Sequence, residues 1–362
     1  MFVKKKKERR GFLDYFPAPK FLEMPATGLA ISDSSVRFVE FEKIRNSLTL
    51  GNYAEELMPP GTISGGFVNN QAELVKILRR IKEKFNLQFV RTALPEEKAY
   101  LFKTTIPTVP DNEIRSALEF KIEENAPIAV SEAVFDYTIV KRKDRKKDDH
   151  INLVVSVLPI KVVNTYLESL HAAGLQPLLF EIESQAIARS VIPKDEDGGF
   201  LIMNLSQRKT SLYIVSDNVV QFTSTVSIGS ESLKTAPTDI FVEQREGAKT
   251  EKNKKYVESF LSQYPGAAAI KDEIEKLYNY WHGHKDEEGK MESKIKKIII
   301  CGDDSYREGL VRYLSFSLEI PVELANVWAN VFSFDNYVPD ISYKDSLRFS
   351  AAIGLTLSAY LQ

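Results

Sequence analysis

The chain has 362 residues, of which 43% are hydrophobic and 27% charged, and its formal net charge is −2. This composition is typical of a globular protein, and the length predicts two or more domains. A general nucleic-acid-binding protein usually has a clear basic excess, so the balanced charge argues against that class. No stretch approaches the roughly 18–20 apolar residues of a membrane span. The single cysteine, Cys301, excludes an internal disulfide.

The first 26 residues predict a flexible tail. They contain a basic run without the long apolar segment of a secretory signal, formed by Lys4, Lys5, Lys6, Lys7, Arg9 and Arg10. Aromatic residues follow the run, so it could adsorb to an anionic membrane face, each cation adding about 1 kcal/mol. A solvated tail is the alternative interpretation, because basic tails are common.

Residues 27–42 predict a β-hairpin with a polar turn at Ser32, Asp33, Ser34 and Ser35. Such a turn can hold phosphate, because it exposes backbone N–H groups and hydroxyls. It contains no glycine, however, which is unusual for a loop that phosphate must approach closely. The turn is therefore a candidate nucleotide site that departs from the usual chemistry.

The following residues extend this hairpin into a larger unit. We expect a third strand at 44–50, a helix capped by Asn69 or Asn70, and a strand at 88–94. Three strands, a helix and a strand in this order are typical of a ribonuclease-H-like unit.

A segment with a different pattern comes next. It predicts a strand, a helix, two strands and a helix, at 100–106, 111–125, 133–140, 151–158 and 161–173. Gly174 is a good helix C-cap, and the charged residues 141–149 predict a solvated loop. The β-α-β-β-α order indicates a small inserted subdomain.

The opening pattern then recurs. After a strand at 175–182 and a short helix that Ser184 could cap, three consecutive strands are predicted at 200–205, 210–215 and 219–228. This is a duplication in element order rather than in residue identity. It predicts two similar domains that face one another across a cleft.

The remaining elements are an amphipathic helix through Trp281, a buried strand at 295–301, a helix through Leu314, a strand at 320–324 and a final helix at 346–361. Small residues in the final helix suit close packing.

Neither the histidines nor the cysteine of this part predicts a reactive site. His282 and His284 lie close together, but no cysteine or further histidine is near enough to complete a metal site. Cys301 is expected to pack as a small hydrophobe.

From about Gly28 onward the chain resembles the family of the type IV pilus assembly protein PilM, an FtsA-like branch of the actin/Hsp70 superfamily. The stretch 106–140 matches the family's inserted subdomain in layout, and LHAAGLQPLLFEIESQAIARS at 170–190 resembles its AAGL segment and connecting helix. Residues 302–310 correspond to the loop that contacts adenosine. RFSAAIGLTLSAYL, which begins at Arg348, resembles the closing helix.

The resemblance implies an α/β, actin-like, duplicated two-domain fold with the inserted subdomain. After the tail at 1–26, we expect a first domain at 27–99, 175–196 and 346–362, an inserted subdomain at 100–174, a second domain at 197–240 and 294–345, and a helical subdomain at 241–293. In the family, ATP with a divalent cation lies between the two domains, held by the two hairpin turns.

The nucleotide motifs depart from the family's pattern at all three positions. Ala30 and Ser32 occupy the aspartate and glycine positions of the first hairpin, Asn204 and Ser206 those of the second, and a Gly-Gly pair becomes Gly302-Asp303. Losing both aspartates removes carboxylates that would hold a hydrated Mg²⁺. We therefore expect a degenerate ATP cleft at Ser32, Asp33, Ser34, Ser35, Asn204, Ser206, Gly302 and Asp303, with no cofactor and no catalytic residue.

Two residues near this cleft have more than one interpretation. Asp33 is either a partial substitute for the lost aspartate or a turn former. Glu183 aligns with a residue near the position that orients water in the superfamily, or it serves the start of the connecting helix.

The leading functional hypothesis is a cytoplasmic adaptor at the inner face of the membrane. The resemblance implies capture of the N-terminal peptide of a PilN-like membrane protein, with Arg115, Glu119, Phe120 and Tyr137 of the inserted subdomain as candidate contacts, and a ring of several copies. The alternatives are a Mg-ATP-dependent ATPase switch and an FtsA-like filament protein.

Overall fold

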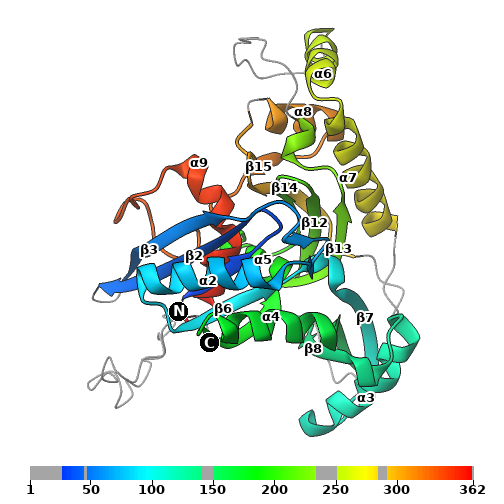
Figure 1. Cartoon of the computed structure of the whole chain (residues 1–362). Helices are drawn as coiled ribbons and strands as arrows, with labels where there is room; N and C mark the ends of the chain where they lie inside the picture. The colour runs from blue at the N-terminus through cyan, green and yellow to red at the C-terminus, as the bar shows by residue number, and fades with distance from the viewer. Residues whose placement is uncertain are drawn as a thin grey trace, which may run out of the picture.

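The computed structural model describes residues 27–44, 47–140, 150–233, 251–283, 292–307 and 309–360, with the backbone alone at 251–254. The predicted basic membrane contact from Lys4 to Arg10 lies outside these residues. Two five-stranded sheets form the body of the molecule, and a smaller sheet projects beside them (Figure 1).

The first sheet has the strand order β10-β6-β1-β2-β3. Its strands are β1 (Gly28–Ile31), β2 (Ser35–Ile44), β3 (Ser47–Leu57), β6 (Phe89–Leu94) and β10 (Gln176–Ile182). Strand β1 is antiparallel to β2 and parallel to β6. Helix α2 (Gln71–Phe85) covers one face, and the Asn70 side chain accepts a hydrogen bond from the Glu73 N–H at its start.

The second sheet repeats this topology, with the order β13-β12-β11-β14-β15. Its strands are β11 (Gly199–Leu205), β12 (Thr210–Ser216), β13 (Val219–Val226), β14 (Ile295–Gly302) and β15 (Val322–Leu324). Strand β11 is antiparallel to β12 and parallel to β14, as β1 is to β2 and β6. The predicted duplication is therefore confirmed.

The insertion forms a three-stranded sheet of order β7-β9-β8. The elements are β7 (Tyr100–Pro107), α3 (Asp111–Asn125), β8 (Ala133–Ile139), β9 (His150–Pro159) and α4 (Ile160–Ala172). The three strands and α3 share one core, whereas α4 packs with α2 on the first sheet. The β-α-β-β-α order is as predicted, but its last helix belongs to the core of the first domain.

Helices α5 (Glu183–Val191) and α10 (Ser350–Leu357) lie between the two large sheets. They approach so closely that a Cβ atom at Gly354 would lie 1.7 Å from the Ala186 carbonyl oxygen. Residues from both domains share one core here, including Phe41, Phe200 and Trp328.

Three helices cover the outer face of the second sheet, namely α6 (Glu251–Gln263), α7 (Gly266–Gly283) and α8 (Leu310–Leu318). The remaining described elements are the hairpin of β4 (Ile63–Ser64) and β5 (Phe67–Val68), helix α9 (Tyr343–Ser346), and the 3₁₀ turns η2 (Glu96–Lys98), η3 (Val130–Glu132), η4 (Ser230–Leu233) and η5 (Leu347–Phe349).

Three expectations about elements need correction. The third strand is not 44–50 but Ser47–Leu57, because it pairs with β2 along its whole length, out to Ser35. The final helix is α9, η5 and α10 in succession, and α10 ends at Leu357. Helix α6 was not among the predicted elements.

Candidate functional site

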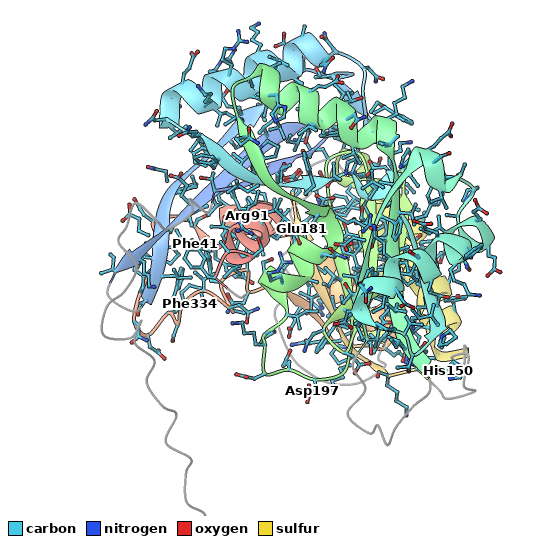
Figure 2. The ribbon with its side chains drawn as sticks, turned by 90° about the horizontal axis from the view of Figure 1, so that it is seen from below. Phe41, Arg91, His150, Glu181, Asp197 and Phe334 are labelled. Atoms are coloured by element: carbon cyan, nitrogen blue, oxygen red, sulfur yellow. The ribbon has the colours of Figure 1, made fainter. Side chains whose placement is uncertain are left out.

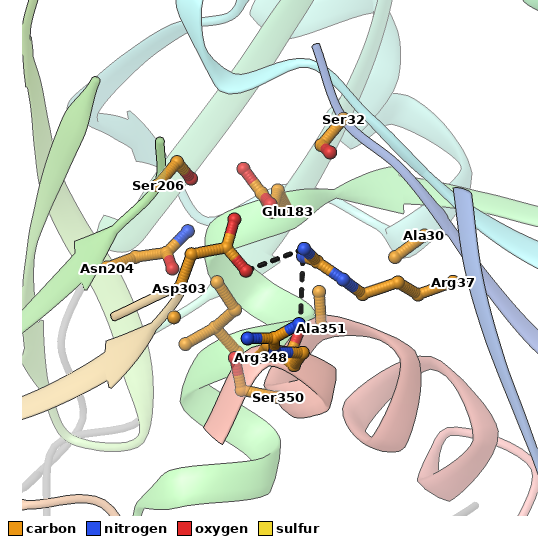
Figure 3. A pocket seen from close by; sticks show the side chains of 12 residues that line it. Ala30, Ser32, Arg37, Glu183, Asn204, Ser206, Asp303, Arg348, Ser350 and Ala351 are labelled. Carbon is orange, nitrogen blue, oxygen red and sulfur yellow. Dashed lines mark hydrogen bonds and ion pairs between the residues drawn. The ribbon is translucent and has the colours of Figure 1, made fainter. Parts of the chain in front are cut away.

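The two hairpins β1–β2 and β11–β12 face one another across a narrow cleft (Figure 3). Its walls come from both domains: Ala30, Ser32, Arg37, Glu183, Ile187, Asn204, Ser206, Gly302, Asp303, Arg348, Ser350 and Ala351. Five predicted residues, Ser32, Asn204, Ser206, Gly302 and Asp303, therefore meet here. The cavity offers only about 20 Å³ to the centres of water-sized spheres, room for about one water, whereas ligand pockets have about 300–1,000 Å³.

The Ser32 hydroxyl holds the first turn together from within. It accepts a hydrogen bond from the Ser35 N–H at 3.1 Å and donates to the Ser35 carbonyl at 3.0 Å. The Ser34 N–H points to the same oxygen at 3.4 Å, and the Ser32 N–H donates to the Ser35 carbonyl. The N–H groups that a phosphate would need are therefore engaged within the turn.

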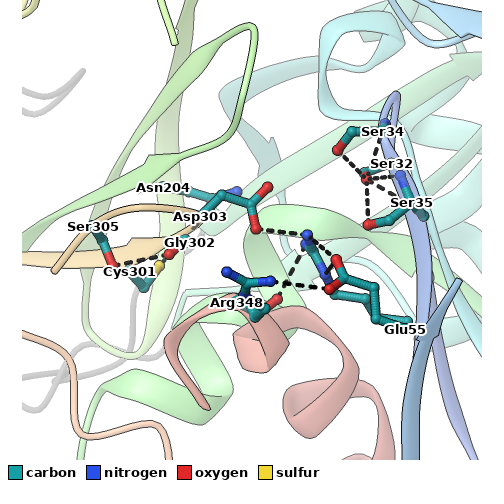
Figure 4. A network of polar contacts seen from close by, with 11 residues as sticks. Ser32, Ser34, Ser35, Glu55, Asn204, Cys301, Gly302, Asp303, Ser305 and Arg348 are labelled. Atoms are coloured by element: carbon teal, nitrogen blue, oxygen red, sulfur yellow. Dashed lines mark hydrogen bonds and ion pairs between the residues drawn. The ribbon is translucent and has the colours of Figure 1, made fainter. Parts of the chain in front are cut away.

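The centre of the cleft is an ion pair between the two domains (Figure 4). An Nη2 atom of Arg37 lies 2.6 Å from the Asp303 carboxylate and 2.6 Å from Glu55 on β3. Arg348 binds the other oxygen of Glu55 at 3.0 Å. Arg37 stands opposite Ala30 in the β1–β2 register, so a small side chain is the strand partner of the arginine.

The carboxylates around Arg37 change its pKa more than its burial does. Burial lowers the pKa of Arg37, but the carboxylates of Asp303 and Glu55 raise it further, so the pKa lies above its usual value. Burial likewise raises the pKa of Glu55, and the two guanidinium groups more than compensate and lower it. Two cations and two carboxylates thus form a balanced network.

Lys209, in the turn of the second hairpin, makes a second contact across the cleft. Its ammonium group lies 2.5 Å from the Glu97 carboxylate of η2. Burial lowers its pKa, but Glu183, Glu97 and Asp33 outweigh burial and raise it. Burial in turn raises the pKa values of Asp33 and Glu183. A lysine therefore supplies the positive charge among three carboxylates.

Gly302 and Asn204 fit together where the second hairpin meets β14. Gly302 has φ of +95°, and a Cβ atom there would lie 2.4 Å from the Asn204 amide oxygen. This residue must be glycine to bring Asp303, which is 5% exposed, toward Arg37. Asp33, Ser34 and Ser35, by contrast, are not among the residues that line the cavity.

Sequence reasoning missed Glu96, which binds the start of the connecting helix α5. Its Oε2 atom accepts the Ser184 N–H at 3.0 Å, so the predicted Ser184 cap is wrong and a distant carboxyl group fulfils that role. The other oxygen is buried and has no hydrogen-bond partner among the residues that the structure describes. Burial raises the pKa of Glu96 to about 7.

The histidine and cysteine candidates that the structure describes, His282 and Cys301, lie in environments typical of structural residues. The Nδ1 atom of His282 lies 2.8 Å from the Tyr278 carbonyl, and its Nε2 accepts from the Ile295 N–H. His284 lies outside the described residues. Burial raises the pKa of Cys301 to about 12, as expected for a packed, unreactive thiol. Within the described ranges no group of metal-binding side chains is assembled.

A second, larger cavity of about 460 Å³ lies between the inserted sheet and the first domain. Three consecutive residues of β8 line it, Val134, Phe135 and Asp136, as do four of β10, Leu179 to Ile182. Its other walls are Leu94, Ser156, Leu158, Val163, Gln185, Arg189 and Ser358. Glu181 forms part of its polar end beside α10, where Arg91 also lies (Figure 2).

The four predicted peptide contacts lie on α3 and β8, outside the lining of this cavity. Arg115 contacts a lining residue, since its guanidinium stacks 4.2 Å from the Phe135 ring and donates to the Phe135 carbonyl. Phe120 is 76% exposed and Glu119 is also exposed, both on α3, while Tyr137 packs against the core of the inserted sheet.

Two sheets of one strand order, each with its first hairpin at a shared cleft, define the class as the actin-like ATPase fold. Residues 28–360 match the family described as type IV pilus assembly protein PilM, and the chain belongs to that family.

The fold resembles a solved structure of the PilM-PilN type IV pilus biogenesis complex, with a TM-score of 0.73 and 18% identity over 94% of this chain and 100% of that chain. A more distant likeness is the ethanolamine utilization protein EutJ from Carboxydothermus hydrogenoformans, with a TM-score of 0.48, 10% identity, and 92% and 90% of the two chains covered.

Another is the cytoplasmic domain of EpsL, an inner membrane component of the type II secretion system of Vibrio cholerae, with a TM-score of 0.43, 10% identity, and 92% and 94% covered. No curated protein gives a match. Among the described residues, no helix combines the length and apolar character needed to span a membrane.

Proposed function

We propose that this PilM-family chain is a cytoplasmic adaptor, peripheral to the inner face of the membrane. It binds the N-terminal cytoplasmic peptide of a PilN-like membrane protein within a pilus or related secretion machine. The observation that carries the proposal is the cavity of about 460 Å³ between β8 and β10. A similar fold occurs in the PilM-PilN complex, which supports a peptide as its occupant.

The walls of this cavity suit an extended peptide. Strand β8 is an edge of the inserted sheet, and β10 is an edge of the first large sheet. Successive side chains of a strand point to opposite faces, so a run of consecutive lining residues means that the cavity follows the strand edges. A peptide placed between two edges can add as a strand and use the neighbouring apolar pockets for specificity.

Peptide titration tests this function, with two variants on β8 as a matched pair. Val134 and Ile139 are each 37% exposed, but only Val134 lines the cavity. We expect Val134→Asp to weaken binding of the PilN-like peptide at least about tenfold, since it puts a charge against apolar surface. Ile139→Asp should bind as the wild type does.

Calorimetry with the purified chain measures both affinities. No binding of the wild type at high micromolar peptide would contradict the proposal, and so would equal losses in the two variants. The remaining candidates, Arg115, Glu119, Phe120 and Tyr137, form a separate face, and alanine substitutions there show whether the peptide extends onto α3.

The proposal includes a cleft that no longer uses nucleotide. The supporting observations are the small cavity, the internally bonded first turn and the side chains that fill the centre. Hydrolysis would need a metal and aligned phosphates. The Asp303 carboxylate of the cleft is paired with Arg37 instead, and the cavity has room for about one water. Assembly into a ring, and contact of the basic tail with lipid, complete the proposed adaptor.

A further inference from the structure

We propose that this chain holds its own cleft closed with an internal ion pair, and that the Asp303 carboxylate occupies the place of a bound anion. The inference deepens the proposed function by explaining how the two domains stay together without nucleotide. It rests on that proposal only in treating the cleft as free of ATP.

The position of the ion pair is the first argument. Arg37 comes from β2 of the first sheet, whereas Asp303 follows β14 of the second, so their 2.6 Å contact ties one domain to the other.

Burial is the second argument. Arg37 is 8% and Asp303 5% exposed, and both line the small cavity. A buried charge is costly unless a partner and further hydrogen bonds satisfy it. Arg37 has both, because its Nε atom binds Glu55 at 2.7 Å and its Nη1 atom reaches the Arg348 carbonyl at 3.3 Å. Separating the domains would leave Asp303 without this partner.

The charge balance is the third argument. Arg37 and Arg348 face Glu55 and Asp303, so the network is neutral as it stands. Removing the Asp303 carboxyl group leaves Arg37 and Arg348 with Glu55 alone, one positive charge in excess among these side chains, and an open space beside them. Glu183 also lines the cleft, but its strongest attraction is to Lys209. An excess positive charge beside an open space is the chemistry of an anion site, and inorganic phosphate or sulfate can then supply the missing negative charge.

The test is anion rescue of an Asp303→Ala variant. We expect its melting temperature to fall by about 5 °C, because one partner of a buried pair is lost. Addition of 10–50 mM inorganic phosphate (an order-of-magnitude range for a weak anion site) should restore most of the loss. Sodium chloride at matched ionic strength should not, since it supplies screening but not a well-shaped acceptor.

Three further variants keep the test decisive. Asp304→Asn changes the neighbouring carboxylate, which is more exposed and lies 3.9 Å from Arg307, and it should neither destabilise the chain nor respond to phosphate. Asp303→Ala combined with Arg37→Leu should lose the rescue. If Asp303→Ala does not fold, Asp303→Asn keeps the side-chain shape and should show the same destabilisation relative to Asp304→Asn.

An Asp303 variant as stable as the wild type would overturn the inference, and so would a phosphate effect shared equally by all variants. These measurements use no peptide. A negative result here therefore contradicts the ion-pair inference and not the proposed adaptor function. The wild-type peptide titration tests that function.

Discussion

Glu96 makes stability depend on pH at the scale of a single residue. Its pKa in the folded protein is about 7, against an ordinary 4.5, so the folded state binds the proton more tightly than the unfolded state does. The contribution of Glu96 to the free energy of unfolding is therefore fully present below about pH 4.5 and is lost as the pH rises through 7. The change across this window is about 3 kcal/mol, because each pKa unit corresponds to about 1.4 kcal/mol.

We expect Glu96→Gln to remove this slope while an amide oxygen still accepts the Ser184 N–H. Urea unfolding at several pH values between 5 and 8 measures how the free energy of unfolding depends on pH. Glu123→Gln, an exposed change on α3, is the control and should retain the wild-type slope. Equal slopes in Glu96→Gln and the wild type would show that another group causes the dependence.

Residue partners were harder to predict than residue positions. The duplicated hairpins predicted that Ser32 and Asn204 lie at one cleft, because element order places two equivalent turns together, and both line the cavity. Asp303, which follows β14, was a candidate only through the family resemblance. Arg37 was missed, since it alternates with Val36 and Phe38 and so looks solvent-facing. Its partner is 266 residues away, and only the packing of the two domains makes that contact.

At the scale of elements, the crossing of α5 and α10 is the closest contact in the centre of the molecule. A Cβ atom at Gly354 would meet the Ala186 backbone, which cannot move without shifting α5. We therefore expect Gly354→Val to cost at least about 3 kcal/mol, the upper range for overpacking. Gly283→Ala is the control, because no described residue has an atom within 4 Å of its Cβ position.

Chemical denaturation of both variants gives the two free energies of unfolding. Equal midpoints would mean that the helices can separate at no cost. The sequence indicated this packing through the small residues Ala351, Ala352 and Gly354, but not which helix they would contact.

Local patterns predicted most elements and missed those that depend on distant neighbours. The buried strands of both sheets, α2 and α3 follow from periodicity and flanking residues. Helix α6 was missed because lysines obscure its apolar side, and that side becomes evident only where Phe260 stacks on Tyr313 of α8. The full length of β3 likewise depends on its pairing with β2.

At the scale of the whole molecule, the proposed adaptor has two domains that are joined by their own side chains. The Arg37–Asp303 and Lys209–Glu97 contacts both cross the cleft. A nucleotide could enter only by breaking them, which would offset much of its binding energy. Binding of ATP and binding of peptide should therefore be uncoupled.

The prediction is that 1 mM ATP with Mg²⁺ (about 100 times a 10 μM dissociation constant) leaves both the melting temperature and the peptide affinity of the wild type unchanged. A site of that affinity would stabilise the fold by about 2.7 kcal/mol, a shift that a thermal melt resolves readily. A rise in melting temperature would show that the cleft still opens to nucleotide. If ATP also changed the peptide affinity, the chain would be a nucleotide-dependent switch, because two ligands are coupled only when each of them binds the two states of the molecule with unequal affinity.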